Sequence, residues 1–198
     1  SVYERFLTLM NLASEKPLLP RLSLPIPKTY LDYANYRLKD DQVFAGLNPG
    51  AGSEEKKWPL DLFIEIAKLL NRNNIRPAFF LGPLEKNLKE EIENKVPASI
   101  FPEFNYPEEH DQSPLLTVAL AQKMAFSLVN DSGGGHLVAA GGKKIITLFN
   151  DRRGEKFRSP FCEQIPLNAS DFMVKKVREI PFEPVLQAVN EAIKIAVN

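Results

Sequence analysis

The fold follows from Phe126-Ser-Leu-Val-Asn-Asp-Ser-Gly-Gly-Gly-His136, where an apolar run ends in three polar residues and three glycines. Residues 137–140 after it have helical character. A buried parallel strand that passes into a helix in this way sets its polar residues where open α/β sheets bind ligands. The glycines let the backbone approach a ligand closely, and the free N–H groups at the start of the helix favour an anion. The segment therefore predicts a phosphate-bearing substrate.

Composition and charge are those of one ordinary globular domain. The 198 residues are 44% apolar and 25% charged, which suits a domain with a sizeable core. The 25 basic residues balance the 25 acidic ones and the pI is about 6.7, so nothing indicates a nucleic-acid partner. Cys162 alone cannot form an internal disulfide and fits a reducing compartment. No apolar run is long enough to span a membrane and no signal peptide is visible, so we expect a cytoplasmic protein.

Strand and helix patterns alternate from residue 42 onward. Strands are predicted at residues 43–47, 78–81, 125–129 and 144–149, with a short one at 98–101. Helices are predicted at residues 60–71, 84–95, 115–123, 135–140 and 181–197. Strands separated by helices of this length indicate βαβ units and a parallel sheet covered on both faces. We therefore expect an α/β fold, a Rossmann-like parallel sheet flanked by helices, over residues 42–198.

Residues 1–41 have a different texture. Residues 1–14 place apolar side chains at helical spacing, and residues 16–28 are rich in proline and are predicted to be an extended connector. The chain begins at Ser1 without a methionine. We therefore expect residues 1–41 to be a helix and a proline-rich lead-in to the α/β domain, and the chain to be a piece of a longer protein.

The loop after the first predicted strand has residues suited to a phosphate. It runs Asn48-Pro-Gly-Ala-Gly-Ser-Glu-Glu-Lys-Lys-Trp-Pro59, and its small residues expose backbone N–H groups. Lys56 or Lys57 supplies a point charge for a diphosphate, and Trp58 anchors the end of the loop. The loop has neither the Gly-Lys-Ser/Thr of a P-loop nor a Gly-x-Gly-x-x-Gly pattern. A glycine-rich turn with a solvated lysine explains the same residues without a ligand.

Polar residues that follow other strands add candidates. Glu85 is placed to accept ribose hydroxyls, although a carboxylate that complements the positive end of its own helix is the better explanation from these residues alone. Asp131 is placed to bind a ligand hydroxyl or to cap the helix, and Ser132 is an equally good N-cap. His136 is placed to donate to a phosphate or sugar oxygen. A lone histidine at a junction of strand and helix more often has a purely structural role.

A charged loop follows the last clear strand. Its Arg152, Arg153, Lys156 and Arg158 face an anionic acceptor or simply solvent, and ordinary solvated charge is the simpler explanation. The chain has two histidines and one cysteine, without zinc-type spacing, so we expect no metal.

Taken in order, these segments resemble the C-terminal, nucleotide-sugar-binding half of the ADP-heptose:lipopolysaccharide heptosyltransferase family, which has the two-domain GT-B glycosyltransferase fold. The resemblance covers roughly residues 43–158. It is carried by Asn48-Pro-Gly-Ala-Gly with Lys56-Lys-Trp-Pro59, by Leu81-Gly-Pro-Leu-Glu85, and by Asn130-Asp-Ser-Gly-Gly-Gly-His-Leu-Val-Ala-Ala140.

The resemblance implies a role for each matching residue. Lys56 holds the donor diphosphate and Glu85 binds the nucleoside ribose. The remaining donor-binding residues line the phosphate loop or the diphosphate and heptose, and they are Ala51, Gly52, Ser53, Asp131, Ser132, Gly133 and His136.

The chain departs from the family pattern in three places. Asn48-Pro49 stands where the family often has His-Pro, and Gly133-Gly-Gly-His136 stands where it often has Gly-Pro-Met-His. Asn150-Asp-Arg152 replaces the usual Gly-Pro-Thr. These positions concern the donor sugar and the domain cleft, so a donor other than ADP-heptose stays open.

The implied function is transfer of heptose from ADP-heptose to lipopolysaccharide core, without metal or cofactor, at the cytoplasmic face of the inner membrane with at most peripheral association. The acceptor site and catalytic base are expected in the preceding N-terminal domain, with residues 1–40 as its tail. Alone, the chain is then expected to bind the donor without transferring the sugar, because transfer needs both halves to close. A nucleotide-sugar epimerase of the same fold and a non-catalytic nucleotide-binding module are the alternatives.

Overall fold

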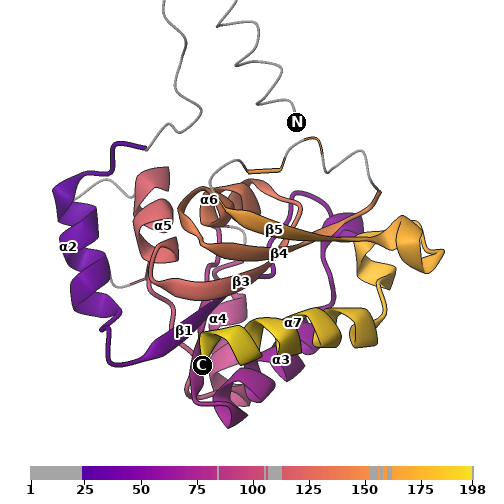
Figure 1. Ribbon diagram of the computed structural model, residues 1–198, viewed down its shortest axis with the longest axis horizontal. Helices are drawn as coiled ribbons and strands as arrows, with labels where there is room; N and C mark the ends of the chain where they lie inside the picture. Colours follow the sequence, from indigo (N-terminus) through magenta and orange to yellow (C-terminus); the bar gives the residue numbers. More distant parts are fainter. Residues whose placement is uncertain are drawn as a thin grey trace, which may run out of the picture.

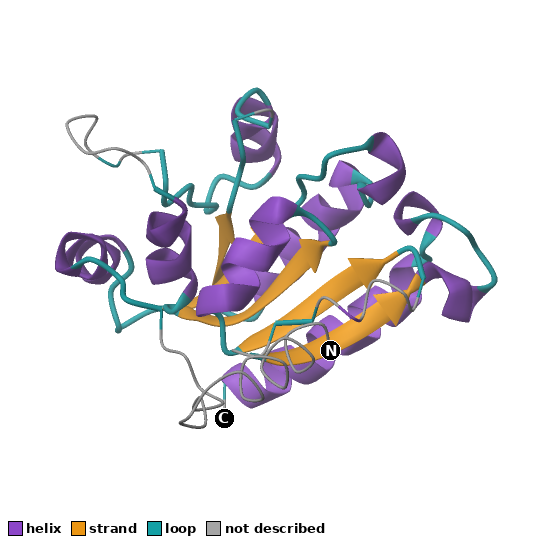
Figure 2. Ribbon diagram, turned by 90° about the horizontal axis from the view of Figure 1, so that it is seen from above, coloured by secondary structure: helices purple, strands orange, loops and turns teal. Residues whose placement is uncertain are grey.

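The computed structural model describes residues 24–83, 85–104, 106, 113–151, 156, 158–159 and 162–197. It is an α/β domain built on a five-stranded parallel sheet in the order β2-β1-β3-β4-β5. Figure 2 shows the strands lying side by side with helices packed around them. The strands are β1 (Val43–Asn48), β2 (Ile75–Phe79), β3 (Met124–Asn130), β4 (Lys144–Phe149) and β5 (Glu163–Asn168). The predicted fold class is confirmed. The helix predicted at residues 1–14 lies outside the described residues, as do Arg152 and Arg153 of the charged loop.

Helices cover both faces of the sheet (Figure 1). They are α2 (Lys28–Arg37), α3 (Leu60–Arg72), α4 (Leu88–Lys95), α5 (Pro114–Ala121), α6 (Gly133–Gly141) and α7 (Phe182–Ala196). Helices α3, α4 and α7 contribute to one hydrophobic core, and α2, α5 and α6 to the other. Neighbouring strand residues face opposite cores, as Ile145 and Ile146 of β4 do. Both faces of the sheet are therefore buried, which explains why the strand sequences are nearly continuous apolar runs.

Strand order reverses between β1 and β3. The chain leaves β1 through α3 for β2 on one side, and the later strands extend the sheet from β3 on the other side. At such a point the crossovers diverge and leave a crevice outside the carboxyl ends of the strands. The loops after Asn48 and Asn130 flank this crevice.

Four elements differ from the sequence prediction. Strand β2 begins at Ile75, earlier than predicted, because Pro77 is tolerated in an edge strand. The strand predicted at 98–101 is reduced to a single bridge between Ile100 and Ala78. Helix α4 starts at Leu88 and α6 at Gly133, whereas the prediction placed these starts at residues 84 and 135.

The sequence prediction missed one strand and one α-helix, β5 and α2. Strand β5 is the other edge strand, and its sequence carries Pro166 and little apolar continuity. Helix α2 has only a weak apolar face, but Tyr30, Ala34 and Leu38 are buried in the core that includes α5. Tertiary packing, which sequence periodicity does not report, stabilises this helix.

Helices α5 and α6 make a close backbone contact that gives the first prediction. A Cβ on Gly141 would lie 2.1 Å from the carbonyl oxygen of Val118, whereas a Cβ on Gly133 would meet nothing within 4 Å. We expect Gly141→Ala to lower the free energy of unfolding by about 1–3 kcal/mol, because the helices must separate. Gly133→Ala, the matched control in the same helix, should leave stability unchanged or raise it by up to about 1 kcal/mol. Urea denaturation measures both, and equal effects would contradict the contact.

Candidate functional site

Two buried asparagines end the strands on either side of the crevice. Asn48, at the end of β1, is 4% exposed; its Nδ2 donates to the carbonyl of Phe80 (2.9 Å) and its Oδ1 accepts from the hydroxyl of Ser132 (3.2 Å). Asn130, at the end of β3, is fully buried. Its amide connects β3 to the loop of residues 49–58, because Oδ1 accepts from Trp58 N (3.2 Å) and Nδ2 donates to Pro49 O (2.8 Å).

Lys56, Asp131 and His136 form a charged cluster at the mouth of the crevice. Lys56 Nζ lies 3.1 Å from Asp131 Oδ2, and His136 Nε2 lies 3.6 Å from Asp131 Oδ1. The Asp131 side chain is 15% exposed, whereas those of Lys56 and His136 are 42% and 45% exposed. The carboxylate thus pairs with the Lys56 ammonium group and lies near the His136 imidazole, and both of these side chains are partly exposed to solvent.

The N-terminus of α6 opens onto the same cluster. Ser132 is the N-cap, and its hydroxyl accepts from Gly135 N at 3.0 Å while it donates to Asn48. That hydroxyl is therefore engaged in capping, the structural role that the sequence also allowed. Nothing lies within 4 Å of a Cβ position on Gly133, so a ligand can approach the first turn of α6.

Glu85 is the most enclosed acidic group of the site, at 7% exposure. Its carboxylate fits between two backbone segments, because a Cβ on Gly50 or on Gly82 would lie 2.9 Å from it. Lys57 Nζ lies 3.8 Å from Glu85 Oε1 and 2.8 Å from Glu54 Oε1. The hydrogen bond to Glu54 raises the pKa of Lys57 above its ordinary value. These groups line a cleft of ≈ 350 Å³ together with Pro49, Trp58, Pro59, Leu60, Asn87 and Leu88.

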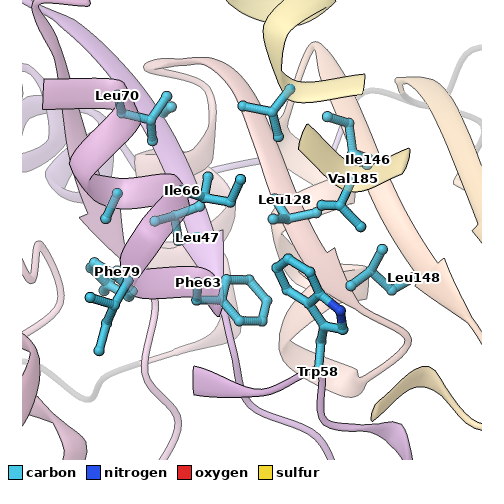
Figure 3. Packing of buried hydrophobic residues seen from close by; sticks show 14 of the residues in the cluster. Leu47, Trp58, Phe63, Ile66, Leu70, Phe79, Leu128, Ile146, Leu148 and Val185 are labelled. Carbon is cyan, nitrogen blue, oxygen red and sulfur yellow. The ribbon is translucent and has the colours of Figure 1, made fainter. Parts of the chain in front are cut away.

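Trp58 fixes the end of the loop in the main core. The ring is 1% exposed, and its Nε1 donates to the carbonyl of Ile180 at 2.9 Å. It stacks on Phe182 and meets Phe63 edge-on, and Figure 3 shows it between Phe63 and Leu148. The predicted anchoring role of Trp58 is confirmed.

The structure places the remaining candidates around these groups. Ala51 is buried, whereas Gly52 and Ser53 are exposed at the turn of the loop. Sequence reasoning missed the two strand-end asparagines as functional supports, although an amide directly after an apolar run was the available signal. Among the described residues, no group of three or more histidine, cysteine or acidic side chains is arranged to hold a metal ion.

This arrangement defines a class of protein: a Rossmann-like α/β domain with a cluster of charged side chains at the switch point of its sheet. A family model described as glycosyltransferase family 9 (heptosyltransferase) matches residues 4–182. The chain belongs to this family. A search of curated proteins found no match.

Solved structures share the fold. The glycosyl transferase family 9 protein from Veillonella parvula superposes with a TM-score of 0.72 at 18% identity, over 94% of this chain and 58% of that one. ADP-heptose lps heptosyltransferase II from E. coli superposes with a TM-score of 0.64 at 19% identity, over 93% of this chain and 56% of that one. The E. coli heptosyltransferase WaaC with ADP superposes with a TM-score of 0.58 at 17% identity, over 80% of this chain and 48% of that one. The chain thus spans between half and three fifths of the length of the first two.

None of the helices in the described ranges combines the length and apolarity that crossing a bilayer requires.

The environment of Trp58 gives the second prediction. Trp58→Phe keeps an aromatic ring against Phe182 but leaves the buried carbonyl of Ile180 without its donor. We expect the free energy of unfolding to fall by about 1–3 kcal/mol. The control Tyr36→Phe, at a side chain 77% exposed, should change it by less than about 0.5 kcal/mol. Chemical denaturation compares the two, and a Trp58→Phe protein as stable as the control would refute the anchoring.

Proposed function

We propose that this chain binds the nucleotide-sugar donor of a glycosyltransferase that transfers heptose from ADP-heptose to lipopolysaccharide core. The observation that carries the proposal is the cluster of Lys56, Asp131 and His136 at the open N-terminus of α6. An ammonium group, an imidazole and free helix N–H groups converge there, and that combination suits a diphosphate.

In the proposed transfer, these residues stabilise the nucleoside diphosphate as it leaves the sugar. An acceptor hydroxyl attacks the anomeric carbon, the bond from that carbon to the diphosphate oxygen breaks, and the nucleoside diphosphate departs with the electron pair. Lys56 and the start of α6 are placed to stabilise the charge that develops on the diphosphate. The proposed reaction uses no metal ion to stabilise this charge. The base that takes the proton of the acceptor hydroxyl is not assigned to a residue of this chain.

Glu85 supplies the second contact of the proposed donor site. A carboxylate accepts two hydrogen bonds from vicinal ribose hydroxyls. Gly50 and Gly82, which lack a Cβ, let the backbone pack against the Glu85 carboxylate and hold it in place. Two relatives support adenine as the base, since one is described with ADP and another as an ADP-heptose enzyme. The other donor-binding candidates line the loop and the first turn of α6, and they are Ala51, Gly52, Ser53, Ser132 and Gly133.

The third prediction tests Lys56. Lys56→Ala removes a charged hydrogen-bond donor, so we expect ADP to bind roughly 10- to 150-fold more weakly, equivalent to about 1.5–3 kcal/mol. Lys68→Ala is the matched control, because Lys68 pairs with Glu65 on the surface of α3, outside the site. Calorimetric titration with ADP, GDP and UDP gives both the loss and the base preference. Unchanged ADP affinity in the Lys56 variant would remove this lysine from the site.

The fourth prediction concerns transfer. The solved relatives are considerably longer than this chain, and we propose that transfer needs the part of such proteins that lies outside the matched region. We expect the purified chain to bind ADP-heptose but to release no ADP when lipopolysaccharide core is added. Acceptor-dependent ADP release by the chain alone would contradict this, and binding of the donor in the same preparation is the control.

A further inference from the structure

We propose that Asn130 is a positioning residue for the donor diphosphate, acting through the loop that carries Lys56. The inference rests on the proposed function, because it assumes that Lys56 contacts the diphosphate. It goes beyond that function in assigning the placement of Lys56 to a single buried amide on a different strand.

The first step is the closure of the loop. Residues 49–58 leave β1 and return to the core, and the two ends of this segment bind the same side chain, that of Asn130. The hydrogen bonds join Asn130 Nδ2 to Pro49 O (2.8 Å) and Trp58 N to Asn130 Oδ1 (3.2 Å). Within the loop, the described regular structure is the short 3-10 helix Glu54–Lys56. The position of that helix relative to β3 therefore depends on this amide.

The second step is the position of Asp131, the partner of Lys56. Asp131 follows Asn130 directly in the chain, and its backbone N–H donates to the carbonyl of Leu148 on β4 at 3.1 Å. The end of β3 thus fixes the carboxylate through the sheet and fixes the lysine through the amide. The 3.1 Å separation between Lys56 Nζ and Asp131 Oδ2 is the result of both constraints.

The third step is the residue type. An asparagine side chain donates through its nitrogen and accepts through its oxygen at the same time. An ionised aspartate has the same shape and accepts only, so it keeps the bond from Trp58 N and turns an oxygen towards the carbonyl of Pro49. Asn130→Asp therefore releases one end of the loop with the smallest possible change of volume.

The experiment is a double-mutant cycle in ADP affinity. The unmodified chain, Asn130→Asp, Lys56→Ala and the double variant are titrated with ADP by calorimetry, and each is also unfolded in urea. We expect Asn130→Asp to weaken ADP binding by about 10- to 100-fold, as loss of the Lys56 contact would. In the Lys56→Ala background, the same change should weaken binding by less than about threefold, because residues that act through one contact are not additive.

Asn168→Asp is the matched control. Asn168 is 2% exposed at the end of β5, and its Nδ2 donates to Asp171 Oδ2 at 3.1 Å, so the change again removes a donor from a strand end. It should lower stability and leave ADP affinity unchanged. Asn130→Leu, of similar volume, is taken through the same cycle, because a carboxyl group in this fully buried position can be protonated and then donate to Pro49 O as the amide does. Leucine makes neither hydrogen bond, and it also takes the place of Asn130→Asp if that variant does not fold.

The outcomes separate the two proposals. If Asn130→Leu keeps full ADP affinity, or weakens binding equally with and without Lys56, the positioning role is wrong while the proposed function stands. If Lys56→Ala has no effect on binding, Lys56 lies outside the site and the positioning role fails, again without deciding the proposed function. If the unmodified chain does not bind ADP, the proposed function fails and the positioning role fails with it.

Discussion

The parallel pairing of β1 with β3 is the constraint on which the site depends. It brings Asn48 opposite Val129, so that the two strand ends and the loops that leave them meet at one edge of the sheet. The crossovers from these strands run in opposite directions, and neither covers the crevice. Had β1 and β3 been separated by another strand, Lys56 and Asp131, which are 75 residues apart, would not meet.

Both lysines of the site already lie beside carboxylates in the absence of a ligand. Lys56 is paired with Asp131, and Lys57 is paired with Glu54 and lies near Glu85. A free phosphate would have to compete with these carboxylates for the ammonium groups. A ligand that offers anionic oxygens to the lysines and hydroxyl groups to the carboxylates satisfies both sets at once, and a nucleotide sugar has both. In the proposed donor site, the order of groups along the ligand would therefore matter more than its net charge.

Sequence patterns predicted the parts of the fold that are fixed by local chemistry. Strands β1, β3 and β4 are apolar runs buried on both faces, and the polar residues after them were placed correctly at one edge of the sheet. The edge strands β2 and β5 contain proline and exposed positions, so periodicity shifted one and missed the other. Helix α2 was missed because its stability comes from packing on α5.

The candidate site was predictable as a set of residues but not as a geometry. The motifs around Lys56, Glu85 and Asp131 were recognisable along the chain. The bonds of Asn130 to both ends of the loop depend on which strands are neighbours and on their register, and a single sequence contains neither.

The two prolines in the edge strands have a consequence for solubility. Pro77 lies in β2 and Pro166 in β5, so each of the two edge strands of the described sheet lacks one backbone donor. On the β2 side, the bridge to Ile100 occupies part of the remaining hydrogen-bonding groups. A strand from another molecule could not form a continuous row of backbone hydrogen bonds with either edge strand. This disfavours aggregation by strand addition. The features that obscured these strands in the sequence are therefore the ones that protect the sheet in a crowded cell.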